Sequence, residues 1–395
     1  MAELTENLIR LRTVHGVGNT ILWRLLRHFG DSDRVLGARE DELAAVKGVS
    51  RDKARLIARA ASFDPRPEME RAVAAGVDII PYDDPGYPQP LLHSFDPPTV
   101  LYVRGTLTKD DWVAVGIVGT RQASPYGRDN AVGMSQALAR GGYTIVSGLA
   151  RGVDTFAHIG ALNVGGRTVG VLGCGFDYMY PEENRDLALE MTRSGAVISE
   201  FTMGTPPSRE TFPTRNRIIA GMAMGVLVIE APVRSGSLIT ARLANEIGRT
   251  VFALPGRVDD PRSEGCNKLI RDGATMVTTV DDIFGELNPS LPLPPLPDPK
   301  EHPRARRAAP SAPALPFGNS PAAAAPPDPE ARPNPKLNAE QQTVLAQLRP
   351  EWSNVDDITA AAGLPAGKTV AALAMLRMMR LAEQGPGQMY RKIDN

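Results

Sequence analysis

The sequence has few cysteines and aromatic residues, no excess of basic charge and no long hydrophobic run. Its 395 residues contain two cysteines, Cys174 and Cys266, which excludes a disulfide framework and favours a reducing compartment. The net charge is −1, so any surface for nucleic acid must be a local patch. No apolar run is long enough to span a membrane, and the N-terminus lacks the pattern of a signal peptide. We therefore expect a soluble, cytoplasmic protein with no membrane partner.

Proline is abundant but unevenly distributed, and its distribution divides the chain. Residues 289–335 contain 16 of the 35 prolines and few large apolar residues. Because such a segment buries too little apolar surface to offset the entropy lost on ordering, we expect a flexible linker there. A chain of this length predicts about two to four domains. We expect a helical domain at 1–64, an α/β domain at 65–288, the linker at 289–335 and a small domain at 336–395.

Two segments of the N-terminal region share one pattern. Val14–Gly18 and Val46–Ser50 each contain a glycine turn that is followed by a helical pattern. Both resemble helix-hairpin-helix turns, in which glycine lets the backbone approach a phosphate. An ordinary small helical bundle explains the same pattern, since glycine also permits a tight turn. The sequence leaves both interpretations open.

Short apolar runs alternate with helical patterns from residue 113 onward. Runs that are apolar on both faces and joined by helices are typical of a parallel sheet. We therefore predict an α/β fold with a Rossmann-like, doubly wound, mostly parallel sheet. The expected strands are Val113–Val118, Tyr143–Ser147, Thr168–Leu172, Ala196–Ser199, Val226–Glu230, Thr250–Leu254 and, as a seventh candidate, Thr275–Val277.

Unusual residues follow the predicted strands, at the edge where such sheets bind ligands. The first strand leads into Gly119, Thr120 and Arg121, and then into a helix that starts at Ser124-Pro125. Free N–H groups at that helix start would suit an anion. The second strand leads into a similar glycine turn with a cation, which comprises Ser147, Gly148 and Arg151. Several such turns at one edge are hard to explain by packing alone and indicate a site for an anion, whereas a single one is more often only a turn.

The segment Arg209–Arg217 is the most informative part of the sequence. It places Phe212 among Arg209, Arg215 and Arg217, with Asn216 beside them. Arginine forks bind phosphates, a phenyl ring stacks on a base, and an amide binds a base edge or a sugar. A surface loop with solvated arginines is the alternative for this segment taken alone.

Common cofactor and catalytic motifs are absent from the sequence or poorly formed. No Gly-x-Gly-x-x-Gly follows the first strand, and Gly363–Thr369 imitates a P-loop with its first glycine one position too close. Asp154 and His158, at helical spacing, indicate a local hydrogen bond rather than a catalytic triad with Ser147. Glu200 and Glu230 could act as acid and base, but we favour ion pairs with nearby arginines. We expect no cofactor, no metal and no enzyme activity.

The motifs at the strand ends together resemble the DprA/Smf DNA-processing family, in order over about residues 80–285. The quoted segments are Val118–Arg121 with Ser124–Gly127, Ser147–Asp154 with Ala157-His158, Tyr180-Pro181 with Asn184, Ser199-Glu200, Phe212 with Arg215–Ile219, and Ser235–Ala241. The family motif Lys-x-x-Phe-x-x-Arg-Asn has Arg209 in place of its lysine here. Charge is kept at that position, but the point-charge geometry of lysine is not.

The resemblance implies a Rossmann-like protein that binds single-stranded DNA, dimerises through this domain and loads RecA during natural transformation. Single-strand-binding protein is a further candidate partner. Arg121, Arg151, Arg209, Arg215 and Arg217 would neutralise phosphates. Phe212 would stack on a base. Gly119 and Gly148 would let the backbone approach the ligand, and Thr120, Ser147 and Asn216 complete the expected site.

The flanking regions also resemble domains of this family. The N-terminal module resembles a sterile-alpha-motif-like or helix-hairpin-helix domain. Residues 336–395 resemble a winged-helix domain, with helices near Ala339–Leu348, Val355–Ala361 and Gly367–Arg380 and a hairpin at Gly385–Lys392. The third of these helices has only Lys368, Arg377 and Arg380 as cations, so binding of duplex DNA and contact with a protein are both open.

An enzyme is the alternative function. The turn Ser235–Thr240 resembles the glycine-rich turn of lysine-decarboxylase-like phosphoribohydrolases, which hydrolyse nucleoside monophosphates. The chain lacks their Pro-Gly-Gly-x-Gly-Thr pattern. This difference favours the DNA-binding function.

Overall fold

The computed structural model describes residues 2–94, 96–287, 339–349, 351–365, 368–369, 372–373, 376, 381–385 and 389–392. The chain divides into two compact units, Met1–His302 and Pro303–Asn395. The linker predicted at 289–335 lies outside the described residues.

The first unit begins with helices, as the sequence predicts. The two glycine turns at Val14–Gly18 and Val46–Ser50 each join two helices, α1 to α2 and α4 to α5. Ser50 caps α5, because its side chain accepts a hydrogen bond from the Lys53 N–H. The helices of this region are α1 (Ala2–Arg12), α2 (Asn19–Phe29), α3 (Ser32–Gly37), α4 (Glu40–Ala44), α5 (Arg51–Ala60) and α6 (Arg66–Ala74).

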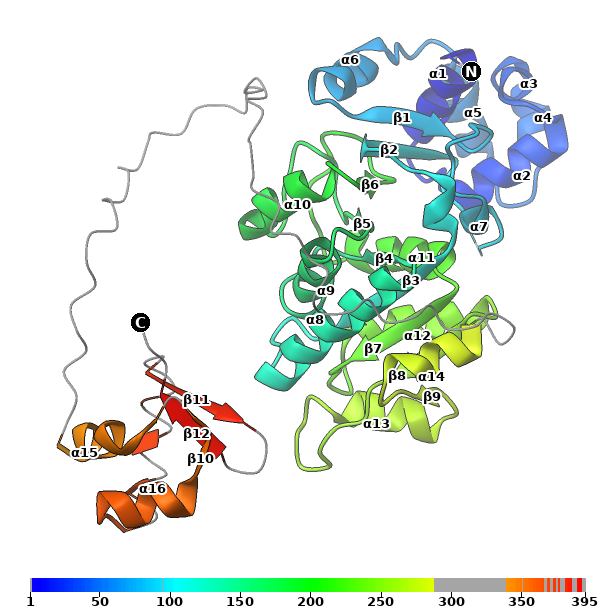
Figure 1. Cartoon of the computed structure of the whole chain (residues 1–395). Helices are drawn as coiled ribbons and strands as arrows, with labels where there is room; N and C mark the ends of the chain where they lie inside the picture. The colour runs from blue at the N-terminus through cyan, green and yellow to red at the C-terminus, as the bar shows by residue number, and fades with distance from the viewer. Residues whose placement is uncertain are drawn as a thin grey trace. The chain divides into compact units, whose positions relative to one another are not determined.

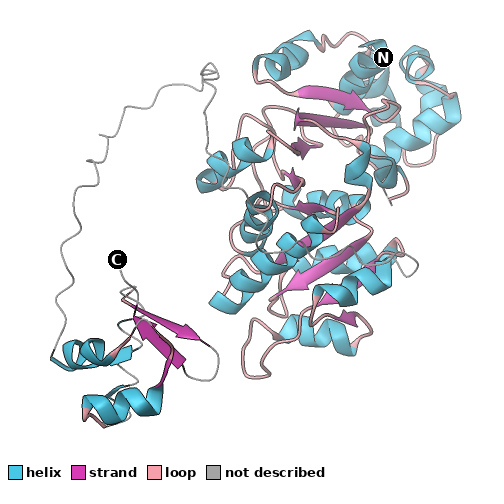
Figure 2. Cartoon of the chain, viewed as in Figure 1, coloured by secondary structure: helices cyan, strands magenta, loops and turns pink. Residues whose placement is uncertain are grey.

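A nine-stranded sheet forms the centre of the first unit (Figures 1 and 2). The seven strands predicted from the sequence are confirmed, and they pair in parallel. They are β3 (Ala114–Gly119), β4 (Thr144–Ser147), β5 (Thr168–Val171), β6 (Ala196–Ser199), β7 (Gly225–Ile229), β8 (Thr250–Ala253) and β9 (Thr275–Met276).

Two further strands were missed by the sequence analysis. β1 (Asp78–Pro81) and β2 (Val100–Gly105) pair antiparallel with each other, and β2 pairs antiparallel with β6. They precede the first strand–helix alternation, so the pattern that predicts a parallel sheet does not include them. Their pairing covers the β6 edge of the parallel sheet.

Helices cover both faces of the parallel sheet, because alternate residues of each strand point to opposite faces. Val115 and Ile117 of β3 pack in the cluster that includes residues of α8 (Pro125–Arg140), α9 (Val153–Asn163) and α14 (Val280–Leu287). Ala114 and Val118 pack in another cluster, with residues of α11 (Thr211–Met222) and α12 (Gly236–Glu246). The remaining elements are α7 (Gln89–Leu92), α10 (Arg185–Met191), α13 (Glu264–Arg271) and the 3₁₀ turns Lys109–Trp112 and Glu182–Asn184.

The strand order is β1-β2-β6-β5-β4-β3-β7-β8-β9. The chain therefore builds the sheet from β3 outward in one direction through β4, β5 and β6, and then returns to build β7, β8 and β9 on the other side. This reversal beside β3 is a topological switch point. Ligands of open α/β sheets bind at the carboxyl ends of the strands at such a point.

The N-terminal helices share a hydrophobic core with the β2 end of the sheet. Leu8, Leu22 and Ile57 belong to the same buried cluster as Tyr102 of β2 and Val197 of β6. Figure 1 shows these helices beside β1 and β2. Residues 2–74 therefore pack as part of the first unit, and we refer to them as the helical module.

The second unit contains α15 (Ala339–Gln347), α16 (Val355–Ala362) and a three-stranded antiparallel sheet of order β10-β12-β11. The strands are β10 (Ser353–Asn354), β11 (Ala382–Gly385) and β12 (Met389–Lys392). Val344, Ile358, Leu373 and Tyr390 lie in its core. Of the predicted third helix, the described residues 368–369, 372–373 and 376 are helical. Arg377 and Arg380 lie outside the described residues.

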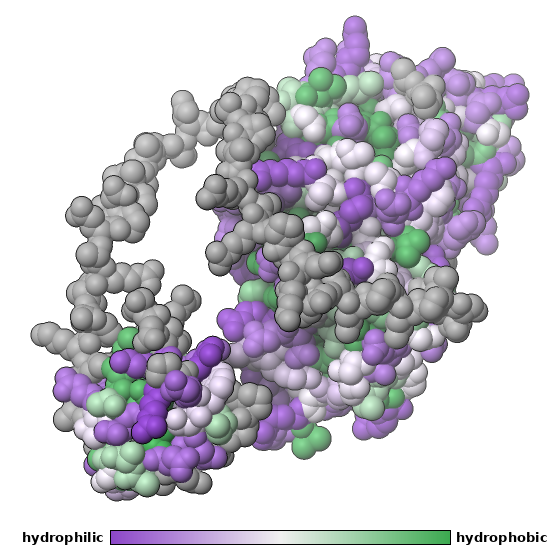
Figure 3. Space-filling model, in the orientation of Figure 1, coloured by the Kyte–Doolittle hydropathy of each residue, from purple (hydrophilic) through white to green (hydrophobic). Residues whose placement is uncertain are grey.

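No helix among the described residues is both long and apolar enough to cross a membrane. On the face of the first unit shown in Figure 3, hydrophobic residues form small areas separated by hydrophilic ones.

Candidate nucleic-acid interface

A groove of about 560 Å³ lies at the switch point. It is bounded by the end of β3, the loop before α9, the segment after β7, and the first turns of α11 and α12. We call it the groove. The described residues that line it are Val118–Arg121, Ala150, Asp154, Tyr180, Arg209, Phe212, Pro213, Arg215, Asn216, Ile219, Pro232, Arg234–Ser237, Ile239 and Thr240.

The lining of the groove is strongly basic. Four arginines and one carboxylate are found among its described lining residues: Arg121, Arg209, Arg215 and Arg234 against Asp154. The local net charge is therefore +3 (4 − 1), although the whole chain has a net charge of −1. Arg121, Arg209 and Arg234 are exposed. Such a site attracts a polyanion and places several guanidinium forks where phosphates would enter.

Helix α11 contributes one stripe of residues to the groove. Phe212, Arg215, Asn216 and Ile219 are spaced at i, i+3, i+4 and i+7, so they lie on one face of the helix. The amide of Asn216 donates to the Gly236 carbonyl at 3.3 Å, which ties α11 to the start of α12. Phe212, Arg215 and Asn216 were proposed as site residues from the sequence, and their position on one helix face brings them together in the groove.

Phe212 is half-buried and belongs to a small cluster of flat side chains. Its ring centroid lies 5.4 Å from that of Tyr180, and the Arg121 guanidinium carbon lies 5.3 Å from it. All three side chains line the groove. A ring in this position can stack on a base while the cations beside it bind phosphates.

Arg215 is oriented into the protein rather than toward solvent. Only 4% of it is exposed, and its Nη1 donates to the Val171 carbonyl at 2.7 Å. The guanidinium lies against Gly148, where any Cβ would overlap it. Burial lowers the pKa of Arg215, and the nearby Asp154 carboxylate opposes this shift. Gly148 is thus required by Arg215 itself, and both residues line a recess that Arg151 also lines.

Gly119 and Thr120 join β3 to the groove. A Cβ at Gly119 would overlap the Ile229 carbonyl and the Val153 side chain, so glycine is required there by internal packing. The N–H of Thr120 donates to the Glu230 carbonyl at 2.7 Å. Thr120 is 8% exposed and lines the groove.

The N-terminus of α8 is not available to an external anion, which corrects the sequence-based expectation. The carboxylate of Glu230 accepts hydrogen bonds from the Ser124 N–H, at 2.9 Å, and from the Ser124 hydroxyl. Ser124 in turn caps the helix by accepting from the Gly127 N–H at 3.1 Å. Glu230 therefore supplies the negative charge that we had expected from a ligand. The ion pair between Glu230 and an arginine of the groove, which the sequence analysis favoured, is not formed.

The N-terminus of α12 opens into the groove instead. Ser235 caps this helix, and Ser235, Gly236 and Ser237 all line the groove. Arg234 stands immediately before them and was missed by the sequence analysis. Its signal was present in the sequence, because Arg234 precedes a serine that caps a helix, as Arg121 precedes Ser124.

Four of the predicted contact residues do not line the groove: Ser147, Gly148, Arg151 and Arg217, of which Gly148 lies in the neighbouring recess. Ser147 is fully buried and donates to the Ile117 carbonyl at 2.5 Å. Arg151 is exposed at the neighbouring recess, where it pairs with Glu183. The Arg217 side chain is 13% exposed and pairs with Glu200 on the other side of α11. These partners are distant in the sequence, so no local pattern predicts the pairs. The expected ion pair between Glu200 and an arginine is present.

The possible triad of Ser147, Asp154 and His158 is not formed. The Nδ1 of His158 bonds Thr168 Oγ1 at 2.7 Å, and its Nε2 has no partner in the described structure. Burial lowers the pKa of His158 to about 3, so the ring is neutral at physiological pH. Asp154 accepts from the Gly148 N–H at 3.1 Å. Asp154 therefore supports the turn and balances the charge of Arg215.

The strand order, the basic groove at the switch point and the second unit together define a Rossmann-like α/β protein with a winged-helix domain. The chain matches the family DNA recombination-mediator protein A over residues 78–288 and the DprA winged helix domain over residues 322–388. It belongs to the DprA/Smf family.

Relatives of the chain extend this match to nearly its whole length. It is 36% identical to Protein Smf of Synechocystis over 388 residues, which cover 96% of each chain. It is 42% identical to DNA processing protein DprA of Bacillus subtilis, with 56% of this chain and 76% of the relative covered. The crystal structure of DNA processing protein A from Streptococcus pneumoniae superposes with a TM-score of 0.62 at 35% identity, covering 70% of this chain and 95% of that one.

Proposed function

We propose that this protein binds single-stranded DNA in the groove, protects incoming DNA and loads the RecA recombinase onto it. The observation that supports this most directly is the combination of three exposed arginines with the half-buried ring of Phe212 in one groove. Arginines bind the backbone of any sequence, and a phenyl ring stacks on any base, so we expect little sequence preference.

The family supports the recombination part of this proposal. The matched family is described as a recombination mediator, and the Bacillus subtilis relative is named a DNA processing protein. We propose RecA as the protein partner, single-strand-binding protein as a further one, and a homodimer through the α/β domain. Two linked grooves on one strand would raise the effective concentration of each for the DNA.

Competition between single- and double-stranded oligonucleotides in a gel shift tests the proposal. The whole chain should retard the single strand at lower protein concentration than the duplex. If about four phosphates are contacted, log K against log salt should have a slope of about −3. Equal affinity for both forms, or an affinity independent of salt, would contradict single-strand binding in a basic groove.

The geometry gives less support to the phosphoribohydrolase alternative. Glu230 accepts hydrogen bonds from Ser124 and Glu200 pairs with Arg217, so both carboxylates considered as acid and base have other partners. The carboxylate that does line the groove, Asp154, accepts a hydrogen bond from the Gly148 N–H. Incubation with AMP should therefore release no adenine, and released adenine would favour the enzyme.

A further inference from the structure

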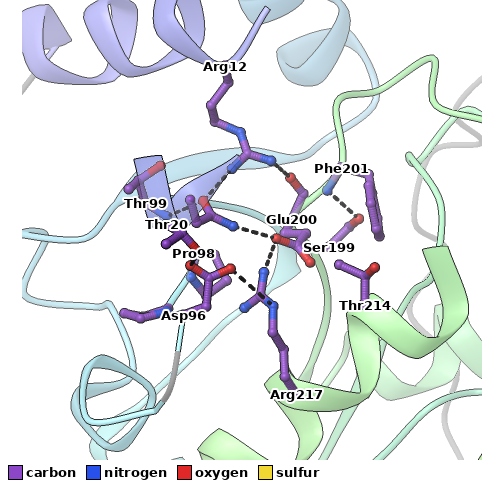
Figure 4. A network of polar contacts seen from close by, with 12 residues as sticks. Arg12, Thr20, Asp96, Pro98, Thr99, Ser199, Glu200, Phe201, Thr214 and Arg217 are labelled. Carbon is purple, nitrogen blue, oxygen red and sulfur yellow. Dashed lines mark hydrogen bonds and ion pairs between the residues drawn. The ribbon is translucent and has the colours of Figure 1, made fainter. Parts of the chain in front are cut away.

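The helical module contacts the segment that leads from β6 into the groove. This segment, residues 200–210, starts at the end of β6 and ends where α11 begins. It contains Arg209, one of the exposed cations of the groove. Figure 4 shows Arg12 from the helical module and Arg217 from α11 approaching Glu200 from opposite sides.

The first contact is a buried polar network around Glu200. Arg12 donates through Nη2 to the Glu200 backbone carbonyl and through Nη1 to Asn19 Oδ1 at 2.9 Å. Asn19 Nδ2 donates to the Glu200 carboxylate at 3.0 Å, and Arg217 pairs with the same carboxylate. Glu200 is only 2% exposed. One residue of the segment is thus held by two residues of the helical module and one of α11.

A second contact lies three residues further along the segment. The Met203 N–H donates to the Glu68 carboxylate of α6 at 2.8 Å. Arg71, also on α6, pairs with Asp177 in the loop after β5. The helical module therefore contacts both the segment 200–210 and the loop after β5.

The direction of α11 makes these contacts relevant to the groove. Successive helical residues are rotated by about 100°, so Arg217 lies about 200° from Arg215 around the helix axis. Arg215 and Phe212 line the groove, whereas Arg217 points to Glu200. An ion pair that fixes Arg217 therefore also fixes the rotation of the groove-lining stripe.

We propose that Arg12, Asn19 and Glu200 are positioning residues for the DNA-binding groove. Through them the helical module sets the position of Arg209 and the rotation of α11. This inference rests on the proposed function, since it assigns the module a role in single-strand binding. Arg12 and Asn19 do not line the groove, so they act through Glu200 and Arg217 rather than by touching DNA.

The test uses the full-length chain with Arg12→Ala, and with Arg10→Ala as the matched control. Arg10 stands two residues earlier on the same helix, and its side chain bonds Glu6, Asn7 and the Phe63 carbonyl within the module. Both variants lose one positive charge. In Arg12→Ala, the Glu200 carboxylate keeps Arg217 as its charge partner, so the network does not hold an unpaired charge.

Three measurements on each variant distinguish positioning from direct contact. Affinity for an oligo-dT strand should fall about tenfold in Arg12→Ala, a size typical of coupling through packed networks. The salt slope should stay that of the wild type, because no phosphate contact is lost. Hydrogen exchange of the backbone amides at 200–216 in the free protein should become faster. Arg10→Ala should behave as the wild type in all three.

Each outcome decides one question. Wild-type affinity and exchange in Arg12→Ala would overturn the positioning role, and a flattened salt slope would show that the helical module touches DNA itself. If the wild-type chain does not bind single-stranded DNA, the proposed function fails, while the exchange measurement still tests the positioning. If Arg12→Ala unfolds below the assay temperature, Arg12→Lys replaces it in the test. Lysine keeps the charge but lacks the guanidinium fork, so the same three results are expected.

Discussion

Arg121 has an exposed guanidinium above the ring of Phe212, whereas Arg215 is 4% exposed and donates to a backbone carbonyl. Arg217 is held by Glu200 and faces away from the groove. These three residues have the same charge but different freedom to bind a ligand. Of the three, only Arg121 can replace its contacts with water by contacts with a phosphate without disturbing the protein interior.

We predict that Arg121→Ala weakens single-strand binding and reduces the magnitude of the salt slope by about 0.7, since one phosphate contact is lost. Binding titrations at several salt concentrations measure both quantities. Arg128→Ala is the matched control, because Arg128 is an exposed residue of α8 that pairs with Asp129 outside the groove. An unchanged slope in Arg121→Ala would place the phosphates elsewhere.

Phe212→Ala should cost about 1–3 kcal/mol of binding free energy and leave the salt slope unchanged, because base stacking releases no counterions. The ring also packs against Gly173, so melting must be measured on the same sample. A variant that melts early but binds normally while folded would show that the ring is structural. Phe212→Tyr, which keeps an aromatic face, should retain most of the affinity.

At the scale of elements, the sequence predicted the parallel strands because they depend on local periodicity, and it singled out the motif of α11 by its combination of arginines, a phenyl ring and an amide. It missed β1 and β2, since these strands precede the alternating pattern and pair antiparallel. It also assigned Ser147 and Arg217 to the site. Their true partners are the Ile117 carbonyl and Glu200, which lie 30 and 17 residues away in the chain. Such pairs depend on the packing of whole elements and leave no local pattern.

The start of α8 gives a prediction for one element. Glu230→Ala removes the carboxylate that binds the Ser124 N–H and hydroxyl, so the helix should lose about 1–3 kcal/mol of stabilising interactions. Sulfate could then occupy the vacated position. We expect sulfate to raise the melting temperature of Glu230→Ala more than that of the wild type, compared with chloride at equal ionic strength.

Glu246→Ala is the control for this measurement, because Glu246 forms an exposed pair with Arg242 on α12. It should respond to sulfate as the wild type does. Identical sulfate responses in all three proteins would show that the α8 N-terminus does not bind an anion when its carboxylate is removed.

At the scale of the whole molecule, the division of the chain decides which fragments can be studied. A fragment of residues 1–287 keeps the groove and the shared core of the helical module and sheet. We predict that it binds single-stranded DNA and dimerises. A fragment of residues 80–287 would expose Tyr102, Val197 and their neighbours, so we expect it to aggregate. Size-exclusion chromatography with light scattering compares the two. A monomeric 1–287 fragment would contradict dimerisation through the α/β domain.

The shared core also has a calorimetric consequence. Apolar contacts that join two segments make their unfolding enthalpies appear in one transition, even where a sequence divides naturally into two domains. Heat absorbed by the helical module and by the sheet should therefore appear as a single peak. In evolution, a destabilising substitution in the interior of α1 or α2 would then reduce the amount of folded protein in the cell, although neither helix lines the groove.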